Sequence, residues 1–382
     1  MVAPDAPVAL PDDADDAGWE ALRAAWFPGD RVNLNPGTLG TPSVPVRAAM
    51  EAFRTRTAGY PLDAYVQGRV ALRAARARAV ALWGGEPAIC GGTTQTMNLL
   101  GLLLPRVVAR APVRVWTTGH EHHGGVGGFE HDSTYVVTYF HADMRDDEMR
   151  DRLRADPPEV LSVSQRAWTD GAALPAAAYV AAARDEAPAC LRIVDAAQSV
   201  GLEAPALGDA DVVVASAHKW LHGPPGTGFA WVSARAREQI GALHRAGEPL
   251  DPDAALAGWE VAGGQDFALY AGVEAALALY AAVGPDRARA RSEALAAFLA
   301  DRLRAALPGA AVDTVSAVVR LRPDGDPYPL YSALNARGVH TKCVKVTPPE
   351  SAPLALLRLG VPWFETRARL AAVADLAGGL RA

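Results

Sequence analysis

The stretch from Asp211 to Trp220 constrains the fold of this chain more than any other part of the sequence. Val212 to Val214 form an apolar, β-branched run that predicts a buried parallel strand. Lys219 follows, ahead of a loop rich in glycine and proline that spans His222 to Gly228. Because ligands of open α/β sheets bind beyond the carboxyl ends of the strands, Lys219 is a candidate nucleophile toward carbonyl groups. Taken alone, this pattern favours an ordinary surface lysine. Residues elsewhere in the sequence must therefore show whether Lys219 is a nucleophile.

Strands and helices alternate from Val113 onward, and this alternation predicts an α/β fold with a mainly parallel sheet. Three of the expected strands lead to reactive side chains: one to His120–His123, one to Asp195 with Gln198 three residues later, and one to Lys219. Since the carboxyl ends of parallel strands share one edge of a sheet, we expect these groups to form one site. The expected strands cover residues 113–118, 134–140, 159–164, 191–195, 211–215 and 227–232.

A segment rich in glycine and threonine precedes these strands. Residues 91–98 run into an apolar helix that we expect to stop at Pro105. Free backbone N–H groups and the hydroxyls of Thr93 and Thr94 at the start of a helix suit an anion such as a phosphate. An ordinary threonine N-cap explains the same residues equally well.

Composition narrows the class of protein and its partners. The chain has 382 residues, of which 50% are hydrophobic, enough for a large core and two domains. A net charge of −6 argues against nucleic acid or an anionic membrane as the main partner. Cys90, Cys190 and Cys343 lack the spacing of metal ligands or disulfides, which suits a reducing cytoplasm. Residues 1–16 carry no basic or long apolar run, so we expect a loose tail and neither a signal peptide nor a membrane span.

A glycine loop around Trp259–Asp266 ends the alternating region. Two helices rich in alanine and leucine follow, over Phe267–Val283 and Ala288–Leu307, with Gly284 and Pro285 as the stop signal between them. We therefore place the domain change near residue 268. The division is an N-terminal segment associated with the small domain (1–30), a large domain (31–267) and a small C-terminal domain (268–382), in which a strand over 354–359 carries Arg358 and a final helix covers 365–380.

A reactive lysine, a carboxylate, a flat histidine and a phosphate loop together match the needs of pyridoxal phosphate. The lysine forms a Schiff base with the cofactor aldehyde, and the carboxylate keeps the pyridine nitrogen protonated. The loop and its helix dipole hold the phosphate, while an aromatic side chain covers the face of the ring.

From NLNPGTLGTP to LLRLGVPWFET, the chain resembles the class V aminotransferase family of fold type I pyridoxal-phosphate enzymes, especially its isopenicillin N epimerase-like and cysteine desulfurase-like branches. The resemblance implies a mainly parallel sheet of the seven-stranded type, flanked by helices, and a smaller α+β C-terminal domain. It implies that Lys219 bonds to the cofactor, that Asp195 and Gln198 contact the pyridine nitrogen and the phenolic oxygen, and that His122 stacks on the ring. The implied phosphate ligands are Thr93, Thr94, Ser216 and His218.

The resemblance also implies how the substrate and a second subunit contribute. Arg358 corresponds to the arginine that binds the substrate α-carboxylate, a task that suits a bidentate guanidinium. Asn35 and His123 are expected at the substrate. Gly264 and Gln265 lie where the family reaches into the neighbouring subunit's phosphate site, which implies a homodimer with shared active sites. The expected partner is a small-molecule amino acid or amine, with no metal, nucleic acid or membrane.

Departures from the family pattern bear on the reaction. Desulfurases carry a mobile cysteine shortly after the strand expected at 339–346, whereas Cys343 falls inside that strand, which favours a structural cysteine. The epimerase-like branch usually has tyrosine at the position of His122 and often threonine at the position of Gln265. The sequence therefore lies between the two branches.

We expect an enzyme that acts at Cα or Cβ of its substrate, with Lys219 taking the Cα proton. A lyase that eliminates at a C–S bond, or an epimerase, is favoured, and an aminotransferase or a cysteine desulfurase is the alternative. His122 or His123 could protonate a leaving group, but the pair of lysine and histidine could also provide the two bases of an epimerase. A non-catalytic scaffold is disfavoured, because Lys219, Asp195 and Arg358 are all present.

Overall fold

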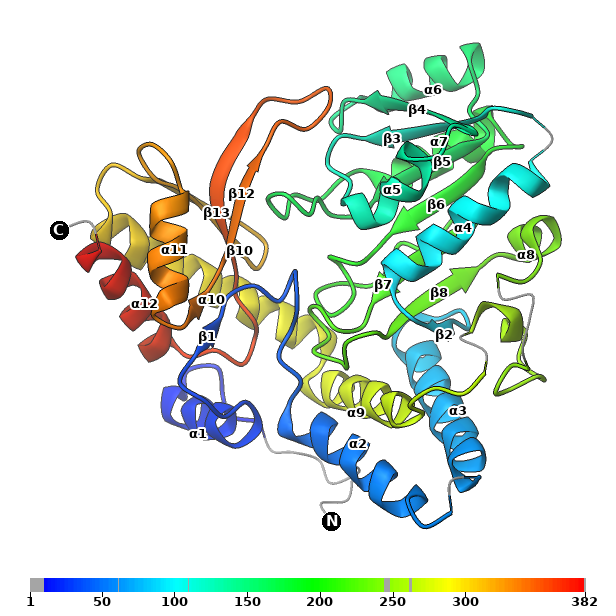
Figure 1. Ribbon diagram of the computed structural model, residues 1–382. Helices are drawn as coiled ribbons and strands as arrows, with labels where there is room; N and C mark the ends of the chain where they lie inside the picture. Colours follow the sequence, from blue (N-terminus) through cyan, green and yellow to red (C-terminus); the bar gives the residue numbers. More distant parts are fainter. Residues whose placement is uncertain (1–9, 61, 109, 244–247, 261–262, 381–382) are drawn as a thin grey trace.

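The computed structural model describes residues 10–60, 62–108, 110–243, 248–260 and 263–380 (Figure 1). Within these residues the largest element is a seven-stranded sheet. Its strands are β2 (Ala88–Cys90), β3 (Val113–Thr118), β4 (Tyr135–Phe140), β5 (Val160–Ser164), β6 (Leu191–Asp195), β7 (Val212–Ser216) and β8 (Gly228–Val232). They lie in the order β2-β8-β7-β6-β5-β3-β4, and only β8 runs against the others. The predicted α/β fold with a mainly parallel sheet is confirmed.

The connections explain the direction of each strand. Helices α5 (His123–Glu130), α6 (Asp146–Ala155) and α7 (Ala176–Glu186) carry the chain between parallel strands. The loop 217–227 returns the chain directly from β7, so β8 pairs antiparallel to it. The longer segment 196–211 carries the chain back from β6, so β7 pairs parallel to β6 although this segment contains no helix. The carboxyl ends of β3, β5, β6 and β7 therefore meet at one edge of the sheet.

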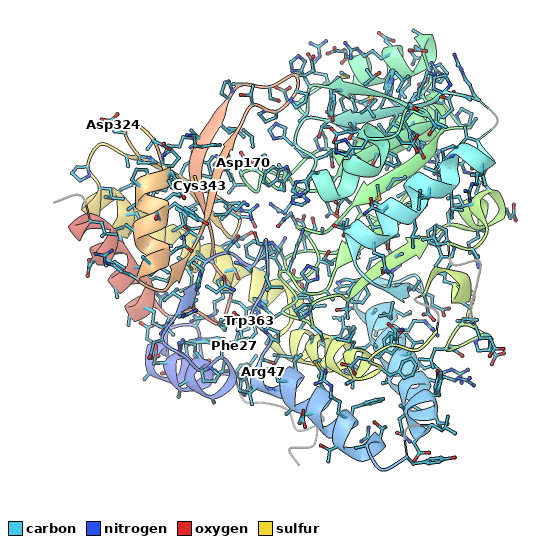
Figure 2. The ribbon with its side chains drawn as sticks, in the orientation of Figure 1. Phe27, Arg47, Asp170, Asp324, Cys343 and Trp363 are labelled. Atoms are coloured by element: carbon cyan, nitrogen blue, oxygen red, sulfur yellow. The ribbon has the colours of Figure 1, made fainter. Side chains whose placement is uncertain are left out.

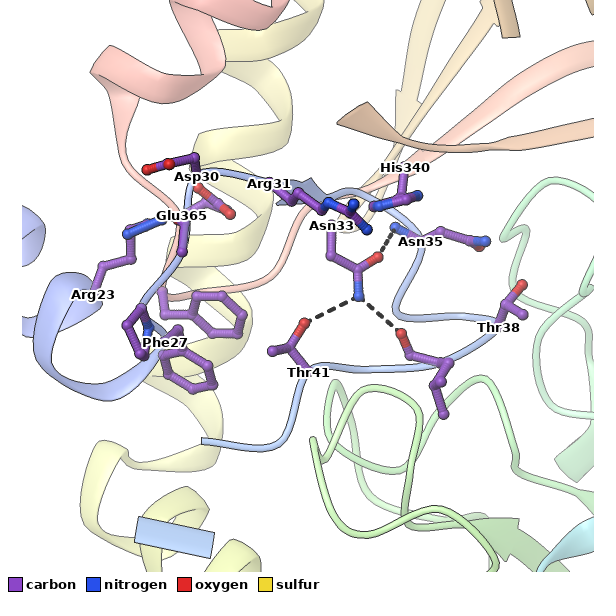
Figure 3. Close-up of a pocket in the computed structure, with 14 residues that line it drawn as sticks. Arg23, Phe27, Asp30, Arg31, Asn33, Asn35, Thr38, Thr41, His340 and Glu365 are labelled. Atoms are coloured by element: carbon purple, nitrogen blue, oxygen red, sulfur yellow. Dashed lines mark hydrogen bonds between the residues drawn. The ribbon is translucent and has the colours of Figure 1, made fainter. Parts of the chain in front are cut away.

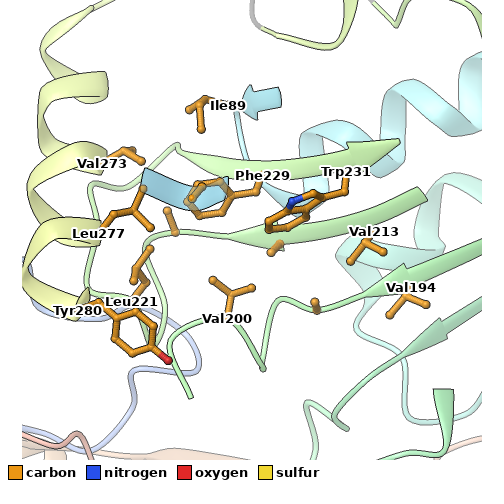
Figure 4. Close-up of a cluster of buried hydrophobic side chains, with 14 of the residues drawn as sticks. Ile89, Val194, Val200, Val213, Leu221, Phe229, Trp231, Val273, Leu277 and Tyr280 are labelled. Carbon is orange, nitrogen blue, oxygen red and sulfur yellow. The ribbon is translucent and has the colours of Figure 1, made fainter. Parts of the chain in front are cut away.

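Side chains of the sheet alternate between two layers of helices. Val212 and Val214 pack with α4 (Thr93–Val107), α5 and α8 (Ala234–Ile240). Val213 and Ala215 pack on the opposite face with α2 (Val44–Thr57), α3 (Asp63–Trp83), α7 and α9 (Ala268–Val283). Figure 4 shows part of this second layer, where Phe229 of β8 lies beside α9. Burial of both faces is the reason why these strands are apolar throughout.

A second sheet lies C-terminal to the first. Its antiparallel strands β9 (Ala311–Val315), β10 (Val318–Arg322), β12 (Lys342–Val346) and β13 (Leu354–Gly360) have the order β12-β13-β10-β9. One face packs on α10 (Pro285–Ala306), α11 (Tyr328–Ala336) and α12 (Arg367–Gly379). The other face turns toward the first sheet, since Val318 packs on Leu202 and Trp220. A short parallel ladder joins β1 (Val32–Asn33) to β11 (Val339–His340).

The prediction that Pro105 ends its helix is wrong, because α4 continues through Pro105 to Val107. Proline has no N–H, so the carbonyl of Gly101, four residues earlier, loses its usual helical donor. The hydroxyl of Tyr135 in β4 takes over and donates to this carbonyl (2.6 Å). A tertiary hydrogen bond therefore compensates for the proline, and local sequence does not show it.

Smaller differences occur in the C-terminal part. Helix α10 begins at Pro285, three residues before the predicted start, because proline suits the first turn of a helix. The strand predicted over 339–346 is divided into β11 and β12. The remaining elements are α1 (Asp16–Trp26) and η1 (Ala257–Trp259). Residues 1–9 of the predicted tail and residues 261–262 of the predicted glycine loop lie outside the described residues.

The division into domains stays a prediction. Helix α9 belongs to the core of the first sheet, whereas α10 belongs to the core of the second. No single helix among the described residues is long and apolar enough to cross a membrane; α9 and α10 satisfy such a test only together, as a pair bent by 77°.

Candidate active site

A cavity of about 220 Å³ lies between the carboxyl edge of the first sheet and the second sheet. It brings together residues that are far apart in the sequence. The predicted site residues that line it are Thr93, Thr94, His122, Asp195, Gln198, Ser216, His218, Lys219 and Arg358. Six further lining residues have no role predicted from the sequence: Gly37, Thr38, Gly124, Gly125, Trp168 and Lys342.

Lys219 lies in the turn that follows β7. Gly40 holds this turn, since its N–H donates to the carbonyl of His218 (2.7 Å) and a Cβ there would lie 2.1 Å from the carbonyl oxygen of Lys219. Burial lowers the pKa of the Lys219 amine to about 8; the Asp195 carboxylate opposes this shift and the Arg358 guanidinium adds to it. Lys219 therefore reaches its neutral, nucleophilic form closer to pH 7 than an exposed lysine does.

Asp195 ends β6 and is only 6% exposed. Its Oδ1 accepts a hydrogen bond from the N–H of Ala197 (2.8 Å), which leaves Oδ2 available to the cavity. A Cβ at Gly125 would lie 3.2 Å from this Oδ2, so a glycine keeps the approach to the carboxylate open. Burial raises the pKa of Asp195, and Lys219 acts against that shift. The buried Asp195 carboxylate therefore suits a ligand whose contacting group carries a positive charge.

The start of α4 forms a seat for an anion. Gly92, the N-cap residue, has a φ of 96° and no side chain with which to cap the first turn. The N–H of Thr93 donates to Oγ of Ser216 (3.4 Å), and the N–H groups that follow it in the first turn can serve a ligand. The Ser216 hydroxyl at the end of β7 donates to Oγ1 of Thr93 (3.1 Å). Gly124, in the first turn of α5, comes so close that a Cβ would lie 2.4 Å from Oγ1 of Thr94. Two helix N-termini therefore converge on this seat.

His122 is the N-cap residue of α5. Its Nδ1 accepts a hydrogen bond from the N–H of Gly124 (3.0 Å), and this bond assigns the ring proton to Nε2. Burial, followed by the charges of Lys219 and His123, lowers the pKa of His122 to about 3. The ring is therefore neutral at pH 7 and stands edge-on to Trp168, with centroids 5.3 Å apart. A neutral flat ring suits stacking on a cofactor better than the donation of a proton to a leaving group.

Arg358 reaches the cavity from the second sheet. Its Nη2 donates to Oδ1 of Asn35 (3.2 Å), and its Nη1 donates to the carbonyl of Trp168. Burial lowers the pKa of Arg358 to about 10. At Gly37, a Cβ would lie 2.9 Å from Nη2 of Arg358 and 2.8 Å from Oε1 of Gln198, so a methyl group there would have to displace these side chains. The loop that contains Asn35 and Gly37 thus connects the second sheet to the first.

Gln198 is held at two points. Its Nε2 donates to the carbonyl of Gly37 (2.9 Å), and its Oε1 accepts from the indole N–H of Trp220 (3.1 Å). The amide is 8% exposed and fixed in orientation.

Four predicted residues lie outside this cavity. Asn35 lines a neighbouring cavity of about 750 Å³, shown in Figure 3, and contributes to the site through Arg358. His123 is exposed, with its ring centroid 3.9 Å from that of His122. Gly264 is exposed, and the Gln265 amide donates to the hydroxyl of Tyr270. The contribution of Gly264 and Gln265 to a second subunit stays a prediction.

Of the lining residues without a predicted role, Trp168 and Lys342 have the largest side chains. Trp168 lies in a loop after β5, where no periodic pattern marks a site. Lys342 lies opposite Arg358 in the register of β12 and β13. A pairing of these two strands inferred from their alternation would have found it.

The side chains that line the cavity fit pyridoxal phosphate. They supply a lysine amine of lowered pKa, a buried carboxylate, a neutral flat ring and an anion seat made of N–H groups and hydroxyls. Gly92, Gly124 and Gly125 keep side chains out of the positions that a phosphate and a ring would need.

Comparisons with known proteins agree with this reading. The family model for class V aminotransferases matches residues 71–321, more than half of the chain. Among curated proteins, none matches the chain significantly.

Solved structures share the fold. The cysteine desulfurase CsdA from Escherichia coli, in an S-sulfonic acid form, gives a TM-score of 0.77 at 18% identity, covering 95% of this chain and 98% of that chain. An apo cysteine desulfurase from Thermococcus onnurineus NA1 gives 0.74 at 15% identity, covering 94% and 97%. The cystine C-S lyase C-DES, in complex with its reaction product cysteine persulfide, gives 0.76 at 17% identity, covering 91% and 98%. With the family match, the expected fold and the expected cofactor, pyridoxal phosphate, are confirmed: the chain belongs to the class V aminotransferase family.

Proposed function

We propose that this protein is a pyridoxal-phosphate lyase that cleaves a C–S bond at Cβ of a cysteine-derived amino acid. The observation that carries the proposal is a cavity lined by Lys219, whose pKa is lowered, and by buried Arg358, but by no cysteine among the described residues. We further propose that it works as a cytoplasmic homodimer, in which Gly264 and Gln265 contribute to the partner subunit's phosphate site.

The location of the thiols separates this proposal from a desulfurase. A desulfurase passes sulfur to a reactive, accessible cysteine. Cys343 lies opposite Leu357 in the register of β12 and β13 and packs into the helix-covered core of the second sheet, whereas Lys342, one residue earlier, lines the cavity. Figure 2 shows Cys343 on the α11 side of β12. Cys90 and Cys190 are buried, and burial raises the pKa of both thiols.

The residues of this chain then have distinct tasks. Pyridoxal phosphate, when bound, supplies an aldehyde that bonds to the substrate amine and a ring that withdraws electrons from Cα. Arg358 binds the α-carboxylate and so orients the Cα–H bond. Neutral Lys219 accepts the Cα proton at Nζ, the Cβ–S bond breaks with its electron pair on sulfur, and the Lys219 ammonium can return the proton to that sulfur. Asp195 holds a proton at the pyridine nitrogen, and His122 covers the ring.

Epimerisation is the less favoured outcome. It requires a second base that protonates or deprotonates Cα from the face opposite Lys219. The low pKa of His122 makes this ring a weak base, and His123 is exposed outside the cavity.

One experiment distinguishes a lyase from a desulfurase. The protein, with pyridoxal phosphate bound, is incubated with cystine and with S-substituted cysteines. A lyase releases a thiol or persulfide, pyruvate and ammonia in equal amounts, whereas a desulfurase releases alanine and leaves a persulfide on the protein. Cys343→Ser should retain full turnover. After borohydride reduction, wild type should carry covalently bound pyridoxal phosphate, seen as an increase in protein mass. Lys219→Ala should show no such increase. Alanine as product, with persulfide on Cys343, would show that the lyase proposal is wrong.

A further inference from the structure

The second sheet carries a row of three cations on one face, two of which line the cavity. Lys342 of β12 lies directly opposite Arg358 of β13, and Arg358 lies opposite Arg320 of β10. Residues opposite each other in antiparallel strands place their side chains on the same face, within reach of one another. Lys342 and Arg358 both line the cavity.

The three cations differ in how their charge is compensated. Arg320 donates to Asp170 (3.0 Å) and to Asp313 (2.6 Å). Arg358 has the neutral acceptors described above. Lys342 has no hydrogen-bond or ion-pair partner among the residues that the structure describes. Like charges placed opposite each other are destabilising, so this arrangement leaves a positive charge that an anionic ligand would offset.

The cavity itself offers little negative charge to Lys342. Within the described residues, Asp195 is the one carboxylate among the lining side chains, and its charge acts on Lys219. The positive charge of Lys342 is also felt across the cavity, where it contributes to the lowered pKa of His122. Asp170, which pairs with Arg320, also acts on Arg358. Lys342 and Arg358 still place two positive charges at this end of the cavity, and an α-carboxylate on Arg358 leaves the charge of Lys342 uncompensated.

We propose that Lys342 is a specificity-determining residue, which selects amino acids that carry a second anionic group, a carboxylate or a sulfonate, on the side chain. The inference rests on the proposed function for the assignment of the α-carboxylate to Arg358. With that carboxylate on Arg358, the side-chain anion lies toward Lys342, on the neighbouring strand. A neutral side chain would leave the ammonium without a partner in a half-buried position.

The test measures binding of ligands that cannot react. Isothermal titration of the pyridoxal-phosphate-loaded protein compares glutarate with its monoamide, which has the same shape and one charge fewer. Wild type should bind glutarate about tenfold more tightly or better, the range of a charge-assisted hydrogen bond. Succinate, glutarate and adipate should show one preferred length, because both cations are engaged at once. Tighter binding of 3-sulfopropionate than of succinate would identify the second group as a sulfonate, and the reverse order would identify a carboxylate.

Variants assign the preference to one side chain. Lys342→Met should remove the preference for glutarate, and Lys342→Glu should make the monoamide the better ligand. Lys345→Met is the matched control, since Lys345 lies on the same strand, pairs with exposed Asp326 (3.3 Å) and lies three residues from Lys342, on the opposite face. It should keep the wild-type preference. A wild-type protein without preference, or a preference that survives in Lys342→Met, overturns the inference.

The binding test is independent of turnover. If no S-substituted cysteine is cleaved while the glutarate preference is present and depends on Lys342, the proposed reaction fails and the anion selectivity stands. Cysteine conjugates are cleaved in the opposite case, but wild type has equal kcat/KM for S-carboxymethylcysteine and for the amide of its side-chain carboxylate. The inferred anion selectivity then fails and the proposed reaction stands.

Discussion

The hydrogen bond from Tyr135 to α4 offers a sharp test of how a buried proline is tolerated. The Gly101 carbonyl is buried, lacks the helical N–H that Pro105 cannot supply, and accepts the Tyr135 hydroxyl at 2.6 Å. Tyr135→Phe keeps the ring and removes this donor. The variant therefore leaves a buried carbonyl oxygen without a partner.

The expected cost follows from that accounting. A buried acceptor left unsatisfied costs about 1–3 kcal/mol, and Tyr135 is only 7% exposed, so water replaces the hydroxyl poorly. Pro105→Ala restores an N–H four residues after Gly101, and the same Tyr135→Phe change should then cost about 1 kcal/mol less. The coupling between the two sites measures the compensation directly.

Native-state hydrogen exchange measures the local cost without assuming that the whole chain unfolds in one step. Peptides from α4 should lose protection in Tyr135→Phe, whereas peptides from α12 should not change. Tyr139→Phe is the control, because the Tyr139 hydroxyl contacts Glu130 at the surface. Equal losses from Tyr135→Phe in the wild-type and Pro105→Ala backgrounds would refute the reasoning.

Two further predictions concern the site and one concerns Glu121, the residue before His122. Attachment of pyridoxal phosphate to the cofactor-free protein, trapped with borohydride and weighed, should rise with pH around a midpoint of about 8, and Asp195→Asn should move the midpoint down because the carboxylate raises the pKa of Lys219. The buried carboxylate of Glu121 accepts hydrogen bonds from Oγ1 of Thr118 (2.7 Å) and from the N–H of Ser164 (2.8 Å). Burial raises the pKa of Glu121 from 4.5 to about 7, so its contribution to stability is present below pH 4.5 and is lost as pH rises through 7. Thermal midpoints of wild type should therefore fall relative to Glu121→Gln across that window; a constant difference would contradict this. Gly37→Ala should raise KM at least about tenfold, since the methyl group displaces Arg358, and an unchanged KM would show that the loop can shift.

Sequence reasoning succeeds where one strand determines the position of one side chain. Asp195 is the last residue of β6, and Lys219 follows β7, so the parallel pairing of these strands is enough to bring them together. The position of Thr93 is predictable because a glycine pair before a helix provides no side-chain cap of its own.

The rest depends on contacts between distant segments. Trp168 enters the cavity from an irregular loop, and its carbonyl meets Arg358 190 residues later. The continuation of α4 through Pro105 depends on a tyrosine from another strand. Neither contact can be predicted from local sequence, because the residues around each partner show no pattern that indicates it.

The two sheets contribute different residues to the cavity, and this bears on how its substrate preference could change. Thr93, Asp195 and Lys219, which fit the cofactor, lie within residues 91–219, whereas Lys342 and Arg358, which we propose face the substrate, lie on β12 and β13. Changes on the cavity face of the hairpin formed by β12 and β13 can therefore alter which amino acid is accepted while the cofactor seat stays intact. Exchange of this hairpin between relatives of the same fold is a route to redesigned substrate scope, with Gly37 and Asn35 as the junction that the incoming segment must match.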